Sequence, residues 1–335
     1  MTEQLTDVSG LTTEQREWIR NEIRAEASKP LSVAIMGQTG VGKSSLLNAL
    51  FGARLAVGDV RPTTKLPEPV TVVGSTGHPM TFWDMPGIGE SVDADESYLS
   101  MYKQKLIDSD VVLWAIHADN RSTAFDAAAL GKVLDVSPGS DKKALVAKVT
   151  FVLTKADLLT PPPWIYCRDG NSGSFAPSRN IRQRLAEKAS YYQQILIRPH
   201  GGLGLTETYN GENFGIDDPR FSYDEHHVRY TGFMSEEMRN HFAQQYPEFA
   251  RVFERLADNQ RVIPCSSQFR YNLIQLMVVI VNKLGENAIG RFQRLVNDVS
   301  QLDQVPVRDM RKLGNLVVWD KKKSRVTFDL DEIKF

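Results

Sequence analysis

The sequence contains few cysteines, and this scarcity argues against two kinds of architecture. Cys167 and Cys265 are the only cysteines among the 335 residues, and they lie far apart in the sequence. Their number and spacing argue against a disulfide framework and against a cysteine-rich zinc site. This composition fits a reducing compartment, and we therefore expect a cytoplasmic protein.

The sequence also lacks an excess of charge and any long hydrophobic segment. Forty basic residues nearly cancel 41 acidic ones, so the overall charge favours neither nucleic acid nor an anionic membrane surface. The apolar run Leu273–Val281 is interrupted by Gln275 and is far too short to span a bilayer. The first ten residues, MTEQLTDVSG, have no basic region followed by an apolar one. We therefore expect neither a transmembrane segment nor a secretory signal.

What the sequence does contain is an alternation of short apolar runs and helical patterns. Strand-like runs occur at 31–36, 69–74, 80–84, 111–117, 149–154 and 261–264, and helical patterns at 44–51, 95–107, 122–136 and 268–288. The runs at 69–74 and 80–84 flank turn residues and predict a hairpin, which places one antiparallel strand at an edge of the sheet. The whole pattern predicts an α/β fold with a mostly parallel, doubly wound sheet.

The periodicity also suggests how the chain is divided. An amphipathic pattern predicts a helix within residues 1–29, ahead of a main domain at 30–290. Residues 160–260 interrupt the regular pattern, and we interpret them as an insertion because both flanks supply strands of one sheet. Residues 291–335 predict a small C-terminal extension made of a helix and a hairpin, with strands at 315–319 and 325–329.

A glycine-rich segment follows the first predicted strand and opens the first predicted helix. Its sequence, GQTGVGKS, matches the phosphate-loop pattern of P-loop NTPases in the context that this pattern requires. Backbone N–H groups of such a loop surround the α and β phosphates, Lys43 reaches the β and γ oxygens, and Ser44 ligates Mg²⁺. The residues expected at the phosphates are Gly37, Gln38, Thr39, Gly40, Val41, Gly42, Lys43, Ser44 and Ser45.

Two later segments contain residues suited to the γ phosphate and the metal ion. Asp84 ends a strand and can hold Mg²⁺ through water, while the N–H of Gly87 can reach the γ phosphate. Upstream, the loop residue Thr64 can complete the metal shell when the γ phosphate is present, with Thr63 as the alternative. The expected metal ligands are Ser44, Thr64 and Asp84, and the expected catalytic residues are Lys43, Thr64 and Gly87.

The residues after the strand at 149–154 indicate the base. Asp157 can accept hydrogen bonds from guanine N1–H and N2–H, which adenine lacks, while the stem of Lys155 lies along the base. Ser266 and Ser267 follow the last strand and offer a backbone N–H for guanine O6. The residues expected at the base are Thr154, Lys155, Asp157, Ser266 and Ser267.

In this order, the motifs resemble those of the translation-factor-related GTPases, most of all the Era-like branch with its HSR1-related, ribosome-binding GTPase domains. The stretches IMGQTGVGKSSLLNALF, WDMPGIGES and VVLWAIHADNR are similar to the bacterial YfjP/YeeP-type GTPase family. The resemblance covers about residues 30–160 and 261–290. It implies GTP or GDP and Mg²⁺ as ligands. The residues it implies are Gly37, Gly42, Lys43 and Ser44 at phosphate and metal, Thr64, Asp84 and Gly87 in the switches, and Lys155, Asp157 and Ser266 at guanine.

Three features depart from the family pattern. Thr154 replaces the usual asparagine of the base motif, which we expect to loosen that loop and weaken affinity without changing selectivity. Ile88 stands where some GTPases carry a glutamine that orients water, so we expect slow intrinsic hydrolysis. The interval between Asp157 and Ser266 is much longer than a minimal GTPase requires.

These observations favour a GTP-hydrolysing molecular switch whose γ phosphate orders the two switch loops for a partner. The alternative is a scaffold that dimerises through its nucleotide face with negligible intrinsic hydrolysis, in which Asn120 or Arg121 projects toward the neighbour. A phosphotransferase built on the same loop is a third hypothesis. The guanine nucleotide is the expected small-molecule partner, and a ribosome, RNA or protein effector is the expected macromolecular one.

Overall fold

The computed structural model describes residues 31–51, 55, 66–73, 79–89, 92–120, 123–135, 142–159, 164–200, 204–207, 214–223, 227–284, 302–310 and 317–327. The helix predicted within 1–29 and the helix predicted after residue 291 lie outside these residues. No helix among the described residues is long and apolar enough to cross a membrane.

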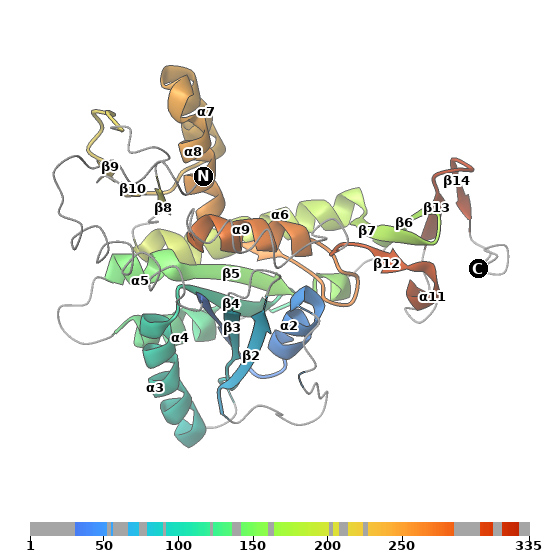
Figure 1. Ribbon diagram of the computed structural model, residues 1–335, viewed down its shortest axis with the longest axis horizontal. Helices are drawn as coiled ribbons and strands as arrows, with labels where there is room; N and C mark the ends of the chain where they lie inside the picture. The colour runs from blue at the N-terminus through green and yellow to red at the C-terminus, as the bar shows by residue number, and fades with distance from the viewer. Residues whose placement is uncertain are drawn as a thin grey trace, which may run out of the picture.

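A six-stranded sheet forms the centre of the molecule (Figure 1), in the order β11-β5-β4-β1-β3-β2. Neighbouring strands are parallel except β2 and β3, so the edge strand β2 is antiparallel. The predicted hairpin and the predicted mostly parallel sheet with one antiparallel edge strand are confirmed. The strands are β1 (Leu31–Gly37), β2 (Glu68–Val73), β3 (Pro79–Asp84), β4 (Val111–His117), β5 (Val149–Thr154) and β11 (Ile263–Pro264).

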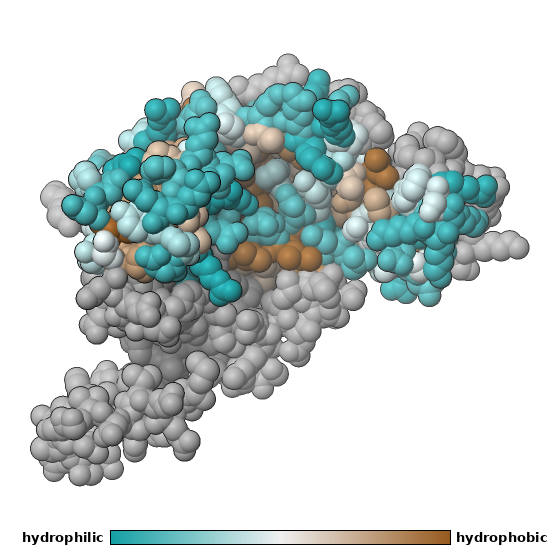
Figure 2. Space-filling view, turned by 90° about the horizontal axis from the view of Figure 1, so that it is seen from above, coloured by the Kyte–Doolittle hydropathy of each residue, from teal (hydrophilic) through white to brown (hydrophobic). Residues whose placement is uncertain are grey.

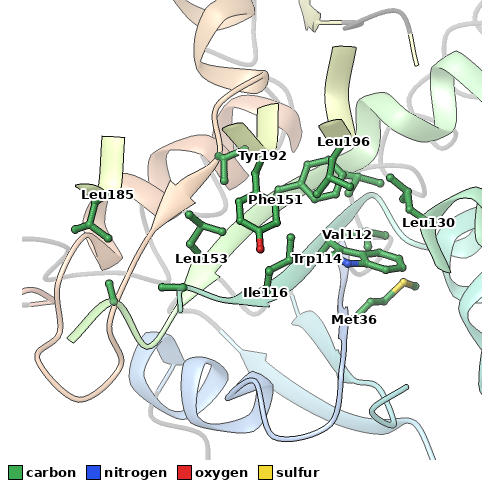
Figure 3. Packing of buried hydrophobic residues seen from close by; sticks show 14 of the residues in the cluster. Met36, Val112, Trp114, Ile116, Leu130, Phe151, Leu153, Leu185, Tyr192 and Leu196 are labelled. Atoms are coloured by element: carbon green, nitrogen blue, oxygen red, sulfur yellow. The ribbon is translucent and has the colours of Figure 1, made fainter. Parts of the chain in front are cut away.

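Helices cover both faces of this sheet, because successive side chains of a strand point to opposite faces. Val33, Ile35 and Leu113 pack with α2 (Lys43–Phe51) and α9 (Leu273–Leu284). Met36 and Trp114 point to the other face, where Figure 3 shows them near Leu130 of α4. The helices on that face are α3 (Val92–Asp108), α4 (Ala124–Leu134), α5 (Lys142–Lys148) and α6 (Arg179–Tyr192). The sheet is therefore doubly wound, as predicted.

The predicted helices differ from the observed ones mainly at their ends. The pattern at 268–288 corresponds to α9, which begins only at Leu273 because the preceding residues form turns. Two of those turn residues, Arg270 and Asn272, have left-handed backbone conformations with φ of 49° and 57°. The helix α5 was not predicted, and α6 is extended by a π-helical turn, Gln193–Ile197, and a 3₁₀ turn, Arg198–His200.

A second sheet combines strands from residues 160–260 with strands from the C-terminal part of the chain. Its order is β12-β7-β6-β13-β14. The predicted C-terminal hairpin is present as β13 and β14, and β13 pairs in parallel with β6. The elements are β6 (Trp164–Asp169), β7 (Ser172–Pro177), β12 (Val305–Pro306), β13 (Val317–Asp320) and β14 (Arg325–Thr327), and the short helix α11 (Val307–Met310) follows β12. We call these five strands the accessory sheet.

A third group of elements, which we call the aromatic unit, lies at the opposite end of the molecule from the accessory sheet (Figure 1). Half of the buried residues in its core are aromatic, namely Phe214, Phe221, Tyr230, Phe242 and Phe253. The unit contains β8 (Gly204–Glu207), β9 (Phe221–Tyr223), β10 (His227–Tyr230), α7 (Glu236–Gln245), a 3₁₀ turn (Pro247–Phe249) and α8 (Ala250–Asn259). The described surface in Figure 2 is mostly hydrophilic, with a few separate hydrophobic patches.

Candidate nucleotide-binding site

The predicted phosphate loop connects β1 to α2 at the carboxyl edge of the sheet. Gly37 has φ of 138°, and a Cβ there would lie 2.2 Å from the carbonyl oxygen of Ala115 on β4, so only glycine fits. Lys43 opens α2 and is 7% exposed, and its Nζ donates to the carbonyl oxygens of Gly37 at 3.2 Å and Gln38 at 3.0 Å. The ammonium is therefore held within the curve of the loop, where a phosphate-binding lysine is needed.

The two described candidates for a metal site lie together. Ser44 is the second residue of α2, and its hydroxyl donates a short hydrogen bond to Asp84 Oδ2 at the end of β3. Asp84 is fully buried. A hydroxyl and a carboxylate oxygen are hard donors of the kind that Mg²⁺ takes together with phosphate oxygens. The residues therefore fit a magnesium ion that completes its shell with nucleotide and water.

The segment after β3 is fastened to the phosphate loop by backbone hydrogen bonds. Thr39 N–H donates to the carbonyl oxygen of Ile88 at 2.9 Å, and Ile88 N–H donates to that of Gly37 at 3.3 Å. Gly87 packs directly on the loop, because a Cβ at this position would lie 2.3 Å from Thr39 Oγ1 and 2.5 Å from its Cα. The structure thus brings Gly87 against the phosphate loop.

Tyr102 of α3 joins these two segments, and the motifs gave no sign of it. Its hydroxyl accepts from Gly37 N–H at 3.1 Å and lies 2.6 Å from the carbonyl oxygen of Pro86 and 3.0 Å from that of Gly37. Burial raises the pKa of Tyr102 far above its ordinary value, so the hydroxyl stays protonated and can donate to one of the two carbonyls. Its place on an apolar helical stripe with Tyr98 and Leu106 would have suggested only a core residue.

Asp126 of α4 holds the phosphate loop from behind and was also missed. This fully buried carboxylate accepts from Gln38 Nε2 at 2.8 Å, Trp114 Nε1 at 3.2 Å and Asn120 Nδ2 at 3.3 Å. Burial raises the pKa of Asp126, and the three hydrogen bonds oppose that rise. The Gln38 side chain is therefore directed into the protein, and Asn120 is engaged by the same carboxylate.

The candidate base residues lie on two neighbouring loops. Lys155 has a left-handed backbone, with φ of 54°, and its stem runs beside Gly42, where a Cβ would meet Lys155 Cε at 3.5 Å. Asp157 Oδ1 accepts a hydrogen bond from the buried Ser266 hydroxyl, which itself accepts from Phe269 N–H at 2.9 Å. Ala156 N–H also donates to the carbonyl oxygen of Cys265 at 3.1 Å. These bonds fix the Lys155–Asp157 segment against the loop that follows β11.

Thr154, which stands where related GTPases carry asparagine, is held at the end of β5 through its own hydroxyl. The side chain is 2% exposed, and its Oγ1 lies 2.6 Å from the carbonyl oxygen of Val41 and 3.1 Å from that of Ile116. The hydroxyl donates to one of these carbonyls at a time and in either case ties β5 to a neighbouring segment. When it donates to Val41, the hydroxyl links the end of β5 to the phosphate loop.

A cavity of about 750 Å³ lies beside the phosphate loop and the base loops, within the size range of ligand pockets. Six of the predicted site residues border it: Gly42, Ser45, Thr154, Lys155, Asp157 and Ser267. The cavity is bordered by Gly42, Ser45, Asn48, Ala49, Thr154, Lys155, Asp157, Leu158, Ser267, Gln268, Arg270, Val305, Pro306 and Asp309.

The remaining predicted residues have different outcomes. Thr64 and its alternative Thr63 lie outside the described residues, as does Arg121. The loop toward Thr64 has one described anchor, because Leu55 exchanges two hydrogen bonds with the side chain of Asn48 at 2.9 and 3.1 Å. Gly40 is exposed at the tip of the phosphate loop, and Val41 is buried beneath it.

Comparison with known proteins agrees with this geometry. Residues 32–152 match the model of the 50S ribosome-binding GTPase family. The protein YfjP of Escherichia coli K12 is 32% identical over 190 residues, which are 56% of this chain and 61% of that protein. YkfA of the same organism is 33% identical over 165 residues, or 49% of this chain and 53% of that protein. The chain thus spans only part of the length of these relatives.

More distant relatives are named GTPases. GTPase Era of Deinococcus deserti is 34% identical over 85 residues, which are 25% of this chain and 28% of that protein. Among solved structures, Era of Aquifex aeolicus bound to GDP and AlF₄⁻ has a TM-score of 0.40 and 18% identity, covering 76% of this chain and 57% of that one. The family match and these relatives agree with the arrangement of the loops: residues 32–152 match the 50S ribosome-binding GTPase family, and this part of the chain is similar to the Era-like P-loop GTPases.

Proposed function

We propose that this protein binds GTP, hydrolyses it to GDP and phosphate, and acts as a Mg²⁺-dependent molecular switch. One observation carries the proposal: a single cavity is bordered both by the phosphate loop, at Gly42 and Ser45, and by the base residues Lys155 and Asp157. A guanine nucleotide has phosphates for the first group and N1–H and N2–H donors for the second. Adenine has no pair of donors that would match the Asp157 carboxylate.

In the proposed reaction, a water molecule attacks the γ phosphorus, the bond from that phosphorus to the β–γ bridging oxygen breaks, and the oxygen leaves on GDP. Lys43 and the backbone N–H groups of the loop stabilise negative charge on the phosphate oxygens. Mg²⁺ held by Ser44, Asp84 and the predicted Thr64 would neutralise further charge on the β and γ oxygens. The N–H of Gly87 would bind the γ phosphate and so report whether it is present.

We further propose that intrinsic hydrolysis is slow. Ile88 occupies the position where some GTPases carry the glutamine that orients the attacking water. Its side chain is 1% exposed and packs in the main hydrophobic cluster, with no group that could hold a water molecule. Another group must therefore orient the attacking water, and a partner protein that supplies such a group would accelerate hydrolysis.

The second candidate function is a scaffold that dimerises through its nucleotide face and hydrolyses GTP negligibly, and Ile88 motivates it equally. Asn120 is a poorer candidate for reaching a neighbour than its sequence position suggests, because its amide donates to Asp126. Activity per molecule that rises with protein concentration would favour this function. A ribosome, RNA or protein effector and a cytoplasmic location remain predictions for either function.

The proposed function is tested by titrating the pure protein with GTP, GDP and ATP, with and without Mg²⁺, and by measuring phosphate release. We expect submillimolar binding of GTP and GDP, much weaker binding of ATP, and tighter GTP binding with Mg²⁺. Asp157→Asn should abolish the preference for guanine, whereas Asp135→Asn, which changes the same charge at a 76% exposed side chain, should not. Equal affinity of the wild-type protein for ATP and GTP would refute the proposal.

A further inference from the structure

The candidate base pocket has a wall that lies outside the GTPase motifs. Val305, Pro306 and Asp309 border the same cavity as Lys155 and Asp157. They belong to β12 and α11, within residues 302–310, which lie beyond the part of the chain that matches the GTPase family. We call residues 302–310 the wall segment.

The wall segment is fastened on one side to α9 and to the loop after β11, which carries Ser266. Asp303 Oδ1 accepts from the N–H groups of Leu273 and Ile274, at 2.9 and 3.3 Å, and so caps the start of α9. Arg270, which itself borders the cavity, donates from Nε to the carbonyl oxygen of Leu302 at 2.6 Å. The wall segment therefore holds a fixed position relative to the loop that carries Ser266.

On its other side the wall segment is part of the accessory sheet. Val305 and Pro306 pair with Gly173 and Ser172 of β7. The Tyr166 hydroxyl donates to the carbonyl oxygen of Val305 at 2.7 Å, and Val307 N–H donates to that of Asn171 at 3.0 Å. Figure 1 shows β12 and α11 at the end of the molecule where β6, β7 and β13 lie.

The loop after β11 also packs on the accessory sheet. Phe269, whose N–H donates to the Ser266 hydroxyl, stacks on Phe175 of β7 with ring centroids 4.2 Å apart and planes inclined by 13°. Trp164 of β6 meets Phe269 and Tyr271 edge to face, with centroid distances of 5.4 and 4.9 Å. The accessory sheet thus supports the loop after β11 through aromatic packing, and it supports the wall segment through backbone pairing.

The chemistry of the wall suits a nucleoside. A purine base has apolar faces and a ribose has two hydroxyl donors, whereas the phosphates are expected at the Lys43 end of the site. An apolar proline ring suits the face of the base. A carboxylate accepts hydrogen bonds from the ribose hydroxyls but would repel phosphate. Pro306 and Asp309 are therefore placed where the nucleoside end of the ligand is expected.

We infer that Pro306 and Asp309 complete the guanosine pocket, with Pro306 packing on the nucleoside and Asp309 accepting a hydrogen bond from a ribose hydroxyl. The accessory sheet then contributes to nucleotide affinity, and nucleotide binding in turn stabilises the wall segment, since coupling between sites is reciprocal. The inference rests on the proposed function.

The inference is tested by measuring GDP affinity of Pro306→Ala and Asp309→Ala by calorimetry, with the wild-type protein first. Each variant should bind GDP three- to tenfold more weakly. The matched control is Asp169→Ala, which removes the same charge from β6 of the accessory sheet, at a 66% exposed side chain that is not among the residues bordering the cavity. This control should bind within twofold of wild type. The affinity should also be measured with 2′-deoxy-GDP and 3′-deoxy-GDP. The loss of affinity caused by Asp309→Ala should be smaller with the analogue that lacks the hydroxyl bound by Asp309.

A second measurement uses only the wild-type chain and therefore does not depend on how the variants fold. Hydrogen exchange at the backbone amides of 302–310 should slow on GDP addition, by at least fivefold at the slowest amides. If the wild-type protein binds GDP while both variants retain its affinity and exchange at 302–310 is unchanged, the wall inference is wrong and the proposed function stands. If the wild-type protein binds no guanine nucleotide, both are wrong.

Discussion

At the scale of single residues, the candidate site contains glycines that pack too closely on neighbouring segments to be replaced by a larger residue. Gly87 touches the phosphate loop at Thr39, and Gly37 touches β4 at Ala115. Both contacts are between segments distant in sequence, so a substitution at either residue moves a loop instead of filling an empty space. Glycine is therefore required at these two positions by the packing of the loops as well as by their predicted role in phosphate binding.

Gly87→Ala should weaken GTP binding at least tenfold and lower the thermal stability. The added Cβ would lie 2.3 to 2.7 Å from Thr39, including its backbone, so the phosphate loop would have to move. Gly131→Ala is the matched control, because no heavy atom lies within 4 Å of a Cβ at this position of α4. That control should leave GTP affinity unchanged and raise the unfolding free energy by about 0.4–1 kcal/mol. Nucleotide titration and urea denaturation of the two variants measure both effects, and equal GTP affinities would show that the loop tolerates the contact.

The residues that motifs indicated are the ones whose chemistry is local. Lys43 and Ser44 follow from a consecutive strand, turn and helix, Asp84 follows from a separate short motif at the end of β3, and the structure places them together. Tyr102 and Asp126 act through partners 65 and 88 positions away, so their polar roles become visible only when the chain is folded. A buried tyrosine or aspartate has no periodic signature that distinguishes a loop-positioning role from ordinary packing.

At the scale of elements, the strands of the central sheet were predictable because each is an apolar run bounded by polar turns. The accessory sheet was not, since β6 and β7 lie among prolines, glycines and serines, and their partners β12 and β13 come from the far end of the chain. The tail hairpin was predicted from its turn, but its parallel pairing with β6 leaves no local trace. In α8, Val252, Phe253 and Leu256 form an apolar stripe that sequence periodicity could have revealed.

One contact between elements makes stability depend on pH. Lys283 near the end of α9 donates to the carbonyl oxygens of Ala147 and Val149, at 2.8 and 2.7 Å, where α5 joins β5. Burial lowers the pKa of Lys283 to about 7, from an ordinary value of 10.5. Between these values the unfolded chain binds one more proton than the folded chain, so this group makes stability rise with pH.

Lys283→Met should therefore remove part of the pH dependence of folding. The difference in unfolding free energy between wild type and variant should grow in favour of wild type from pH 7 to pH 9, by at most about 1.4 kcal/mol per pH unit. Urea denaturation at pH 7, 8 and 9 measures this difference, and groups that titrate alike in both proteins cancel in it. A difference that stays constant across this range would mean that Lys283 keeps its proton in the folded state.

At the scale of the whole molecule, the accessory sheet shares a hydrophobic core with the central sheet, whereas the aromatic unit has a core of its own. The central sheet and its helices form two large clusters, and Trp164, Tyr166 and Phe175 of the accessory sheet belong to one of them. The aromatic unit has its own cluster, and it meets the rest of the protein mainly where α8 and β8 contact α9. The candidate nucleotide cavity is bordered by residues around the central sheet and from the accessory sheet, and by none of the described residues of the aromatic unit.

This division predicts that damage to the aromatic unit stays local. Phe253 is fully buried among Phe214, Phe221 and Phe242, so Phe253→Ala should cost roughly 3–5 kcal/mol within that unit. Hydrogen exchange should accelerate in α7, α8, β9 and β10, while GDP affinity stays within twofold of wild type. Phe151→Ala is the matched substitution in β5, the strand that ends at Thr154, and it should lower both global stability and GDP affinity. If Phe253→Ala weakens GDP binding as much as Phe151→Ala does, the aromatic unit and the nucleotide site unfold as one body.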